Sequence, residues 1–268
     1  MGKLVAEPRK LRLPITLGFR DGISSVHTSR TMMLAELSLV FDHLGPKASA
    51  DEFLAAVVEH NVLGKPTQAT RKRTAQRLTE LYSFDSTLPV FRTLRHFWAA
   101  DSVGQPMLAY LAATARDPLL RDITPIVVAV PVGTIVDSKV LAKQLEEKCP
   151  GRFSPATLIS TAQNLASSWN QAGYLSGRLN KKRIRPNVTP VVVTFALLLG
   201  YLCGTRGKML FDTIWTRMLD RTPAEMTDFA IEASKQGWVT YKAIGAVAEV
   251  TFPGLLTPQE EKLSNESD

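Results

Sequence analysis

The clearest signals for the fold lie in residues 137–187, DSKVLAKQLEEKCPGRFSPATLISTAQNLASSWNQAGYLSGRLNKKRIRPN. Asp137 can cap a short helix, which the Pro-Gly pair at its far end stops. Ser154 followed by Pro155 is a strong start signal for a longer helix, and Gly173 ends that helix. A basic extended hairpin follows. This order of helix, tight turn, longer helix and hairpin is typical of a helix-turn-helix with a wing.

The longer of these helices is amphipathic. Its apolar seam is formed by Leu158, Ala162, Leu165, Trp169 and Ala172. The predicted outward face carries short hydrogen-bonding side chains and no acid, namely Thr157, Ser160, Thr161, Asn164, Ser167, Ser168 and Gln171. Because the major groove of DNA admits one α-helix, this face is predicted to contact duplex DNA.

The run that follows the helix, residues 177–185, holds five positive charges and no negative one. Each phosphate contact would release condensed counterions, so affinity would fall steeply with salt. The predicted DNA contacts of this wing are Arg178, Lys181, Lys182, Arg183 and Arg185. Two alternatives stand beside this interpretation: a hairpin that is simply solvated, and a winged helix that docks a partner protein.

A second basic cluster lies upstream, around Lys65. Arg73 and Arg77 are four residues apart and share one face of a predicted helix. The further candidate DNA contacts from this cluster are Arg71, Lys72, Arg73 and Arg77, with a solvated helix face as the alternative. A third candidate contact is an N-terminal arm that carries Arg9, Lys10, Arg12 and Arg20.

The chain on either side of residues 137–187 is also predicted to be helical. In residues 1–136 we expect a bundle with helices over 29–44, 49–62, 67–84, 87–100 and 105–122. The second of these helices opens on a capping box formed by Ser49 and Glu52. In residues 188–268 we expect a core helix from Pro190, a helix over 208–219, a helix that starts at Thr222-Pro223, a β-hairpin over 238–252 and a frayed polar tail. The predicted fold is mainly α, a helical bundle with a winged-helix-like segment (137–187) and a C-terminal β-hairpin.

Composition narrows the chemistry. The 268 residues include 32 Lys and Arg against 25 Asp and Glu, a net charge of +7 that favours polyanionic partners. Two cysteines and four histidines form no CxxC or HxxxH pattern, which argues against a zinc site. We find no P-loop, no dinucleotide-binding glycine pattern and no GxSxG elbow. The protein is therefore predicted to be non-enzymatic and to need no cofactor.

The longest apolar stretch, Val188–Gly204, is near the lower limit for spanning a bilayer. It contains Pro190, and Arg206 follows it closely. A buried core helix is the better interpretation. We expect a cytoplasmic protein with no membrane partner.

Four stretches together resemble a known family. They are TSRTMMLAEL (28–37), EHNVLGK (59–65), TRKRTAQRLTELY (70–82) and LASSWNQAGYL (165–175). Over roughly residues 25–200 the chain resembles the BrxA proteins of BREX phage-defence systems. It departs from them in being longer, and residues 205–268 have no counterpart.

The resemblance implies a small non-enzymatic component that is encoded with a methyltransferase, an ATPase and a phosphatase-like protein. It also implies a helical fold similar to that of NusB, an RNA-binding antitermination factor. The residues themselves favour double-stranded DNA over RNA, because the predicted contact is a helix with a wing and not an aromatic platform. Three hypotheses follow: a DNA-binding accessory component of a defence system, a protein scaffold for other subunits of that system, and an RNA-binding NusB-like protein.

Overall fold

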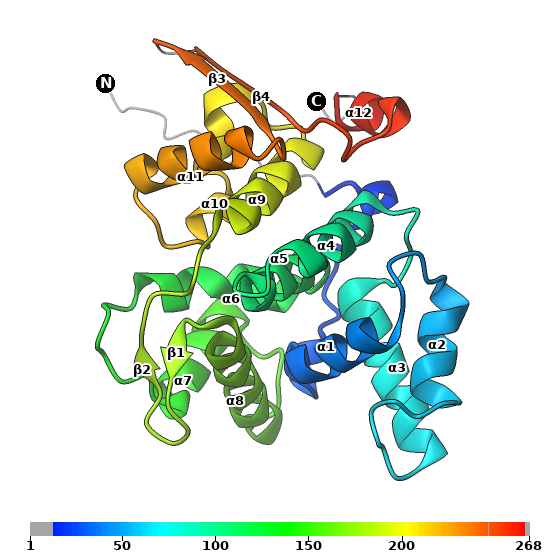
Figure 1. Ribbon diagram of the computed structural model, residues 1–268. Coiled ribbons are helices and arrows are strands. Elements are labelled where there is room, and N and C mark those ends of the chain that lie inside the picture. Colours follow the sequence, from blue (N-terminus) through cyan, green and yellow to red (C-terminus); the bar gives the residue numbers. More distant parts are fainter. Residues whose placement is uncertain (1–12, 246, 266–268) are drawn as a thin grey trace.

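The computed structural model describes residues 13–245 and 247–265 (Figure 1). It is mainly helical with two short antiparallel hairpins, as the sequence predicts. The N-terminal elements are the 3₁₀ helices η1 (Ile15–Leu17) and η2 (Val26–Thr28), followed by α1 (Leu34–His43), α2 (Ala50–Val58), α3 (Gln68–Tyr82), α4 (Pro89–Ala100), α5 (Gln105–Arg116) and α6 (Pro118–Ala129).

The caps read from the sequence start the expected helices. Ser49 and Glu52 form the predicted capping box at the start of α2. The Thr67 side chain accepts from the backbone N–H of Thr70 at the start of α3. Such caps satisfy backbone donors that have no partner inside the helix, so these starts were predictable from local sequence.

Two expected helices differ from the structure. The predicted helix over 105–122 is two helices, α5 and α6, because Pro118 disfavours helical backbone at Asp117, whose ψ is 104°. The side chain of Asp117 then caps α6 by accepting from the N–H of Leu120 at 3.0 Å. The predicted helix over 29–44 begins only at Leu34, because the chain first forms η2 and turns at Met33, whose φ is 57°.

Residues 137–187 fold into the expected elements and also pair with a neighbouring segment that the sequence did not reveal. The expected parts are α7 (Ser138–Lys148), α8 (Pro155–Ala172), β1 (Leu175–Ser176) and β2 (Lys182–Arg183). Residues 133–136, just before α7, form an isolated antiparallel bridge to β2 through Ile135 and Lys182, and the N–H of Val136 donates to Lys181 O at 2.8 Å. The N–H of Arg183 donates in turn to Thr134 O at 2.8 Å. The helix-turn-helix therefore carries a two-stranded hairpin whose β2 also bonds the segment before α7.

The C-terminal part surrounds one buried helix. Its elements are α9 (Pro190–Leu202), η3 (Gly207–Asp212), α10 (Ile214–Arg217), α11 (Pro223–Lys235), β3 (Thr240–Ile244), β4 (Val247–Thr251) and α12 (Pro258–Asn265). Residues 191–202 are buried along α9, which packs against α4, α5, α10, α11 and α12. The apolar stretch is thus a core helix, and no helix within the described residues has the length and apolar character needed to cross a membrane.

Two C-terminal expectations are wrong. The helix expected over 208–219 is split into η3 and α10 at Thr213, whose side chain caps α10. The expected frayed tail forms α12, in which Ser264 is buried. An ion pair of 2.6 Å between Arg92 and Glu260 fastens α12 to α4, a contact between residues too distant in sequence to predict from local pattern.

The three predicted segments share a continuous hydrophobic core that runs from Leu17 to Phe252. The helix-turn-helix joins this core through the seam of α8, where Leu165 and Trp169 are fully buried. In Figure 1, α7, α8 and the β1–β2 hairpin lie at the lower left and the β3–β4 hairpin projects at the top.

Candidate nucleic-acid interface

The seam of α8 faces the core and leaves two polar flanks. One flank is open to solvent and consists of Ala156, Ile159, Ser160 and Gln163, which are all exposed. Their spacing of three and four residues places them on one stripe of the helix. No residue of α8 carries a charge. The turn that precedes α8 adds one exposed cation, Arg152.

Ile159 and Gln163 are not among the residues predicted for this surface. A signal was present, because Ile159 lies outside the apolar seam that begins at Leu158. A large apolar residue on the polar side of an amphipathic helix has no role in that helix's core. Its 49% exposure confirms that the fold does not bury it.

The other polar flank of α8 is covered, so the prediction that it faces outward is wrong. Thr161 and Ser168 are 0% exposed. Asn164 Nδ2 donates to the carbonyl of His27 at 3.0 Å, and Gln171 Oε1 accepts from the N–H of Leu34 at 3.1 Å. These side chains satisfy the backbone of η2 and of the start of α1, and they are unavailable to DNA.

Thr157 continues the stripe of the covered flank and Ser167 the stripe of the open flank, and both are half-buried. The hydroxyl of Thr157 is 2.9 Å from that of Ser154, the N-cap of α8. Ser167 Oγ accepts from Lys181 Nζ at 3.3 Å and so connects the helix to the wing. Of the predicted helix contacts, Ser160 is the one that the structure leaves fully exposed.

A buried polar network lies beneath the covered flank. His27 Nδ1 is 2.9 Å from Asp117 Oδ2, and His27 Nε2 is 2.9 Å from Ser168 Oγ. The Asp117 carboxylate also accepts from the hydroxyl of Ser25 at 2.8 Å and from the N–H of Val26 at 2.8 Å. Burial alone would raise the pKa of Asp117, but the nearby His27 and the donated hydrogen bonds lower that pKa to about 2.

This Asp-His-Ser order is that of a hydrolase triad, yet the surroundings give it a structural role. Ser168 Oγ is 2.9 Å from the N–H of Met32, which donates to it, and 3.0 Å from the carbonyl of Asn164. With Ser168 and His27 both 0% exposed, no substrate can reach the hydroxyl. The network fastens η2 to α8 and to the start of α6.

The wing presents three of its five predicted cations. Arg178 and Lys182 are exposed, and Leu179 between them is 91% exposed at the tip of the hairpin. Lys181 is half-buried against Ser167, and this partial burial lowers its pKa.

Arg183 is not a surface residue, so its assignment as a DNA contact is wrong. It is 1% exposed, its Nε donates to Val127 O at 2.8 Å and its Nη2 is 2.7 Å from Asp220 Oδ2. Successive side chains of a strand point to opposite faces, so Arg183 points inward while Lys182 points outward. Arg185 is exposed, but Glu225 at 3.4 Å and Asp220 at 3.8 Å compensate its charge.

The upstream basic cluster is largely engaged in holding its own region together. Arg71 donates to the carbonyls of Lys65 and Val58, and Arg77 pairs with Glu80 at 2.9 Å. The cluster members whose side chains remain exposed are Lys72 and Arg73. In Figure 1, α3 and the β1–β2 hairpin lie on opposite sides of α1, so the structure does not bring this cluster to the wing.

The N-terminal arm gives one described cation. Arg20 donates from Nη1 to the carbonyl of Glu80 at 3.2 Å, which ties the segment to α3. The other arm residues, Arg9, Lys10 and Arg12, lie outside the described residues.

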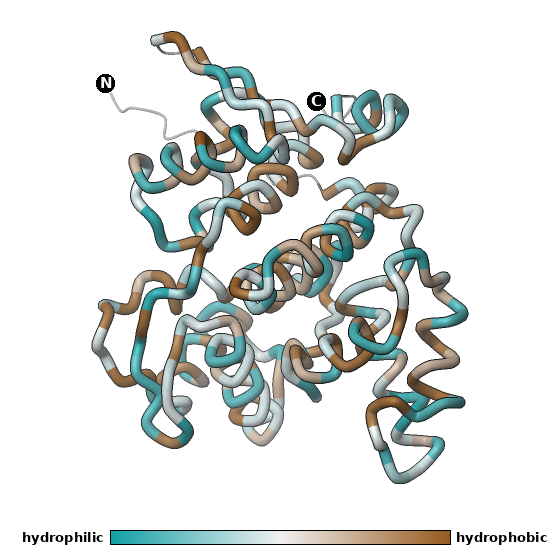
Figure 2. The backbone as a smooth tube through the Cα atoms, viewed as in Figure 1, coloured by the Kyte–Doolittle hydropathy of each residue, from teal (hydrophilic) through white to brown (hydrophobic). Residues whose placement is uncertain are grey.

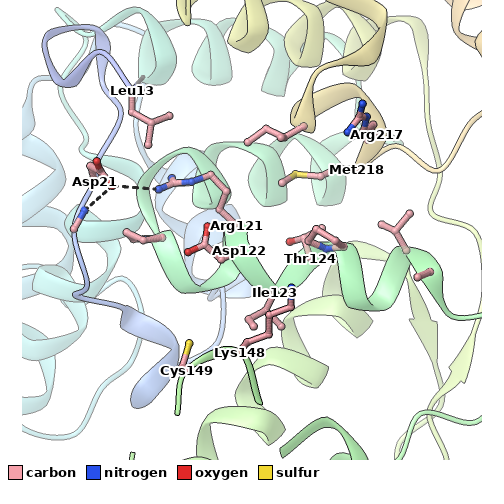
Figure 3. A pocket seen from close by; sticks show the side chains of 16 residues that line it. Leu13, Asp21, Arg121, Asp122, Ile123, Thr124, Lys148, Cys149, Arg217 and Met218 are labelled. Atoms are coloured by element: carbon pink, nitrogen blue, oxygen red, sulfur yellow. Dashed lines mark hydrogen bonds and ion pairs between the residues drawn. The ribbon is translucent and has the colours of Figure 1, made fainter. Parts of the chain in front are cut away.

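A cavity of about 770 Å³ lies between α6, the end of α7 and α10 (Figure 3). Its lining is mainly apolar and carries both signs of charge, with Asp21 and Asp122 beside Arg121 and Lys148. Arg121 is already occupied, since its Nη1 donates to Thr114 O at 2.9 Å. The cavity thus favours neither an anion nor a cation. Among the described residues, no group of His, Cys, Asp and Glu is arranged to hold a metal ion.

No protein-family model matches this chain, and no curated protein matches it. The function must therefore be argued from the open flank of α8 and from the wing.

Proposed function

We propose that this chain is a non-enzymatic protein that binds duplex DNA, with α8 in the major groove and the β1–β2 hairpin beside the phosphate backbone. One observation carries the proposal. The open flank of α8, the exposed cations Arg178 and Lys182 and the half-buried Lys181 lie on neighbouring elements that contain no acid. A helix of this kind fits the width of the major groove, and the wing cations fit the charge of the phosphates.

The shape of the site favours DNA over RNA. The major groove of A-form RNA is deep and narrow, so side chains on a helix such as α8 cannot reach its base edges. The exposed tip of the wing carries no aromatic residue on which an unpaired base could stack, since its sequence is Gly177-Arg178-Leu179-Asn180. Both features argue for a duplex with B-form geometry.

The salt dependence of binding provides the test. Three phosphate contacts predict a slope of about −3 for log affinity against log salt. We would measure fluorescence anisotropy with a random duplex, the matching single strand and an RNA hairpin at several salt concentrations. Replacing Arg178 and Lys182 by Ala should weaken duplex binding and reduce the slope to about −1.

A matched pair of lysines provides the control. Lys235 and Lys242 have side chains that are 69% and 70% exposed, on α11 and β3. Replacing both by Ala removes the same charge from a distant surface and should leave the slope unchanged. If this pair lowers affinity as much as the wing pair does, binding reflects net charge and the wing assignment is wrong.

A second candidate function, the docking of partner subunits, is favoured by the β3–β4 hairpin. Its tip, seen at the top of Figure 2, exposes Ile244 by 87% and Val247 by 72%. Apolar side chains with this exposure are common at protein contacts. A flat response to all three nucleic acids at low salt would favour this scaffold function over DNA binding.

The cellular role is proposed from the family resemblance alone. We propose that the protein is an accessory component of a BREX-like phage-defence system and acts in the cytoplasm, where it meets DNA. The RNA-binding alternative that the NusB-like fold implies is tested by the RNA hairpin in the same titration.

A further inference from the structure

Two exposed residues of α8 are not explained by the fold. Ile159 is 49% exposed although the neighbouring Leu158 already supplies the apolar contact to the core. Gln163, one turn later, is exposed, and within the described part of the chain its amide makes no hydrogen bond. Residues four apart on a helix have side chains about 5–6 Å apart, so this pair forms one small surface.

The chemistry of this pair matches one kind of base pair. A Gln side chain can bond adenine in the major groove at both N6 and N7, and an apolar side chain can contact the C5-methyl group of thymine. Guanine is most often recognised by Arg or Lys, and cytosine by Glu or Asp. Residues 155–172, which form α8, contain none of these four residue types.

We propose that Gln163 and Ile159 select A·T base pairs in the major groove, Gln163 through adenine and Ile159 through the thymine methyl group. This inference rests on the proposed binding of duplex DNA and adds sequence preference to it. The wing cations then supply affinity that does not depend on sequence, and these two residues supply the discrimination.

Duplexes that differ only in major-groove atoms test the proposal. We would measure affinity at one fixed salt concentration for an A·T duplex and a G·C duplex of equal length. Two further duplexes would carry uracil in place of thymine, which removes the C5-methyl group, or 7-deazaadenine in place of adenine, which removes N7. Neither substitution alters the hydrogen-bonding groups of the minor groove, so a preference for its width in A·T DNA would survive both.

The wild-type protein should bind the A·T duplex about fivefold or more tightly than the G·C duplex and should lose affinity with each analogue. Ile159→Ala should remove the sensitivity to uracil and keep the sensitivity to 7-deazaadenine. Gln163→Ala should show the reverse pattern. Lys182→Ala, the matched control, should weaken binding to all four duplexes by the same factor, because it contacts phosphate and not base.

The outcomes separate this inference from the proposed function. Equal affinity for all four duplexes overturns the A·T preference and leaves duplex binding intact. A preference for A·T DNA that both analogues leave unchanged also overturns it, since the minor groove would then be the source. Absence of binding to every duplex overturns both. Both positions are exposed, so unchanged thermal unfolding of Ile159→Ala and Gln163→Ala would assign their effects to recognition and not to folding.

Discussion

The two polar flanks of α8 are similar in sequence and different in surroundings. Both carry small and amide side chains without charge, with Ser160 and Gln163 on one flank and Asn164 and Ser168 on the other, and the first flank also carries Ile159. The first flank is exposed, whereas the second donates to the backbone of η2 at His27 and accepts from the backbone N–H of Met32. Composition alone therefore does not distinguish a surface that can bind DNA from a surface that holds the protein together.

The difference originates in a segment far away in sequence. His27 of η2 contacts Ser168 directly, and Asp117, the N-cap of α6, contacts the other nitrogen of the His27 ring. Buried polar groups remain stable only when they are hydrogen-bonded, and each member of this network supplies a partner for the others. The covered flank is therefore expected to be sensitive to substitution, and the open flank to be tolerant.

The largest effect expected from this contrast is that of His27→Ala. Removing the imidazole leaves the buried Asp117 carboxylate without the ring nitrogen that lies 2.9 Å from it, which costs about 3–5 kcal/mol of folding free energy. Gln163→Ala on the open flank should change stability by no more than about 0.5 kcal/mol. Urea unfolding followed by circular dichroism measures both values.

The same pair of variants should separate stability from binding. Gln163→Ala is expected to fold normally and to lose only its discrimination between duplexes, whereas His27→Ala is expected to lose helix docking along with stability. Equal stability of the two variants would contradict the contrast between the flanks, because the buried network would then contribute nothing measurable.

A smaller effect is expected from acid. The pKa of Asp117 is about 2 in the folded protein, against an ordinary value of 3.8. Between these values the unfolded chain binds more protons, so acidification favours unfolding. The stabilisation is fully present above pH 4 and is lost as the pH falls through about 2. At about 1.4 kcal/mol for each unit of pKa it amounts to about 2 kcal/mol.

Other carboxylates also titrate in this range, so the measurement compares two proteins. The stability difference between the wild type and Asp117→Asn, taken from urea midpoints at pH 5, 4, 3 and 2, should narrow as the pH falls. A difference that stays constant over this range would mean that Asp117 is not ionised in the folded network.

Local sequence was sufficient to place most of the fold. Ser49, Thr67, Ser154 and Thr222 each cap the helix that was expected to start after them, and Gly173 ends α8 with a φ of 87°. Caps and glycine stops act within one turn of the chain, so they can be recognised without tertiary information. The helix-turn-helix and both hairpins followed from such signals.

The candidate site was less predictable, because the exposure of each side chain depends on which distant elements pack over it. Ile135 bridges to Lys182 of β2, which is far away in sequence, and nothing in the short segment 133–136 identifies that partner. The burial of Arg183 depends on Asp220, and the covering of Asn164 depends on η2. Arg183 was correctly assigned to the wing and Asn164 to α8. Whether each side chain points to solvent or to the interior was decided by long-range packing.

The smallest effect concerns a hydroxyl on the covered flank that the network does not satisfy. Thr161 is fully buried, and within the described residues its Oγ1 has no hydrogen-bond partner. An unsatisfied buried hydroxyl costs stability, so Thr161→Val, which keeps the shape and removes the polar atom, should stabilise the protein by about 1 kcal/mol. For a chain of this size that raises the thermal midpoint by about 2–4 °C. Ser160→Ala, its neighbour on the open flank, should leave the midpoint nearly unchanged, because Ser160 is exposed and water can replace the bond that its hydroxyl donates to the carbonyl of Thr157 at 3.0 Å. If Thr161→Val instead lowers the midpoint, the hydroxyl of Thr161 is bonded to a buried water. Every polar side chain of the covered flank would then have a hydrogen-bond partner.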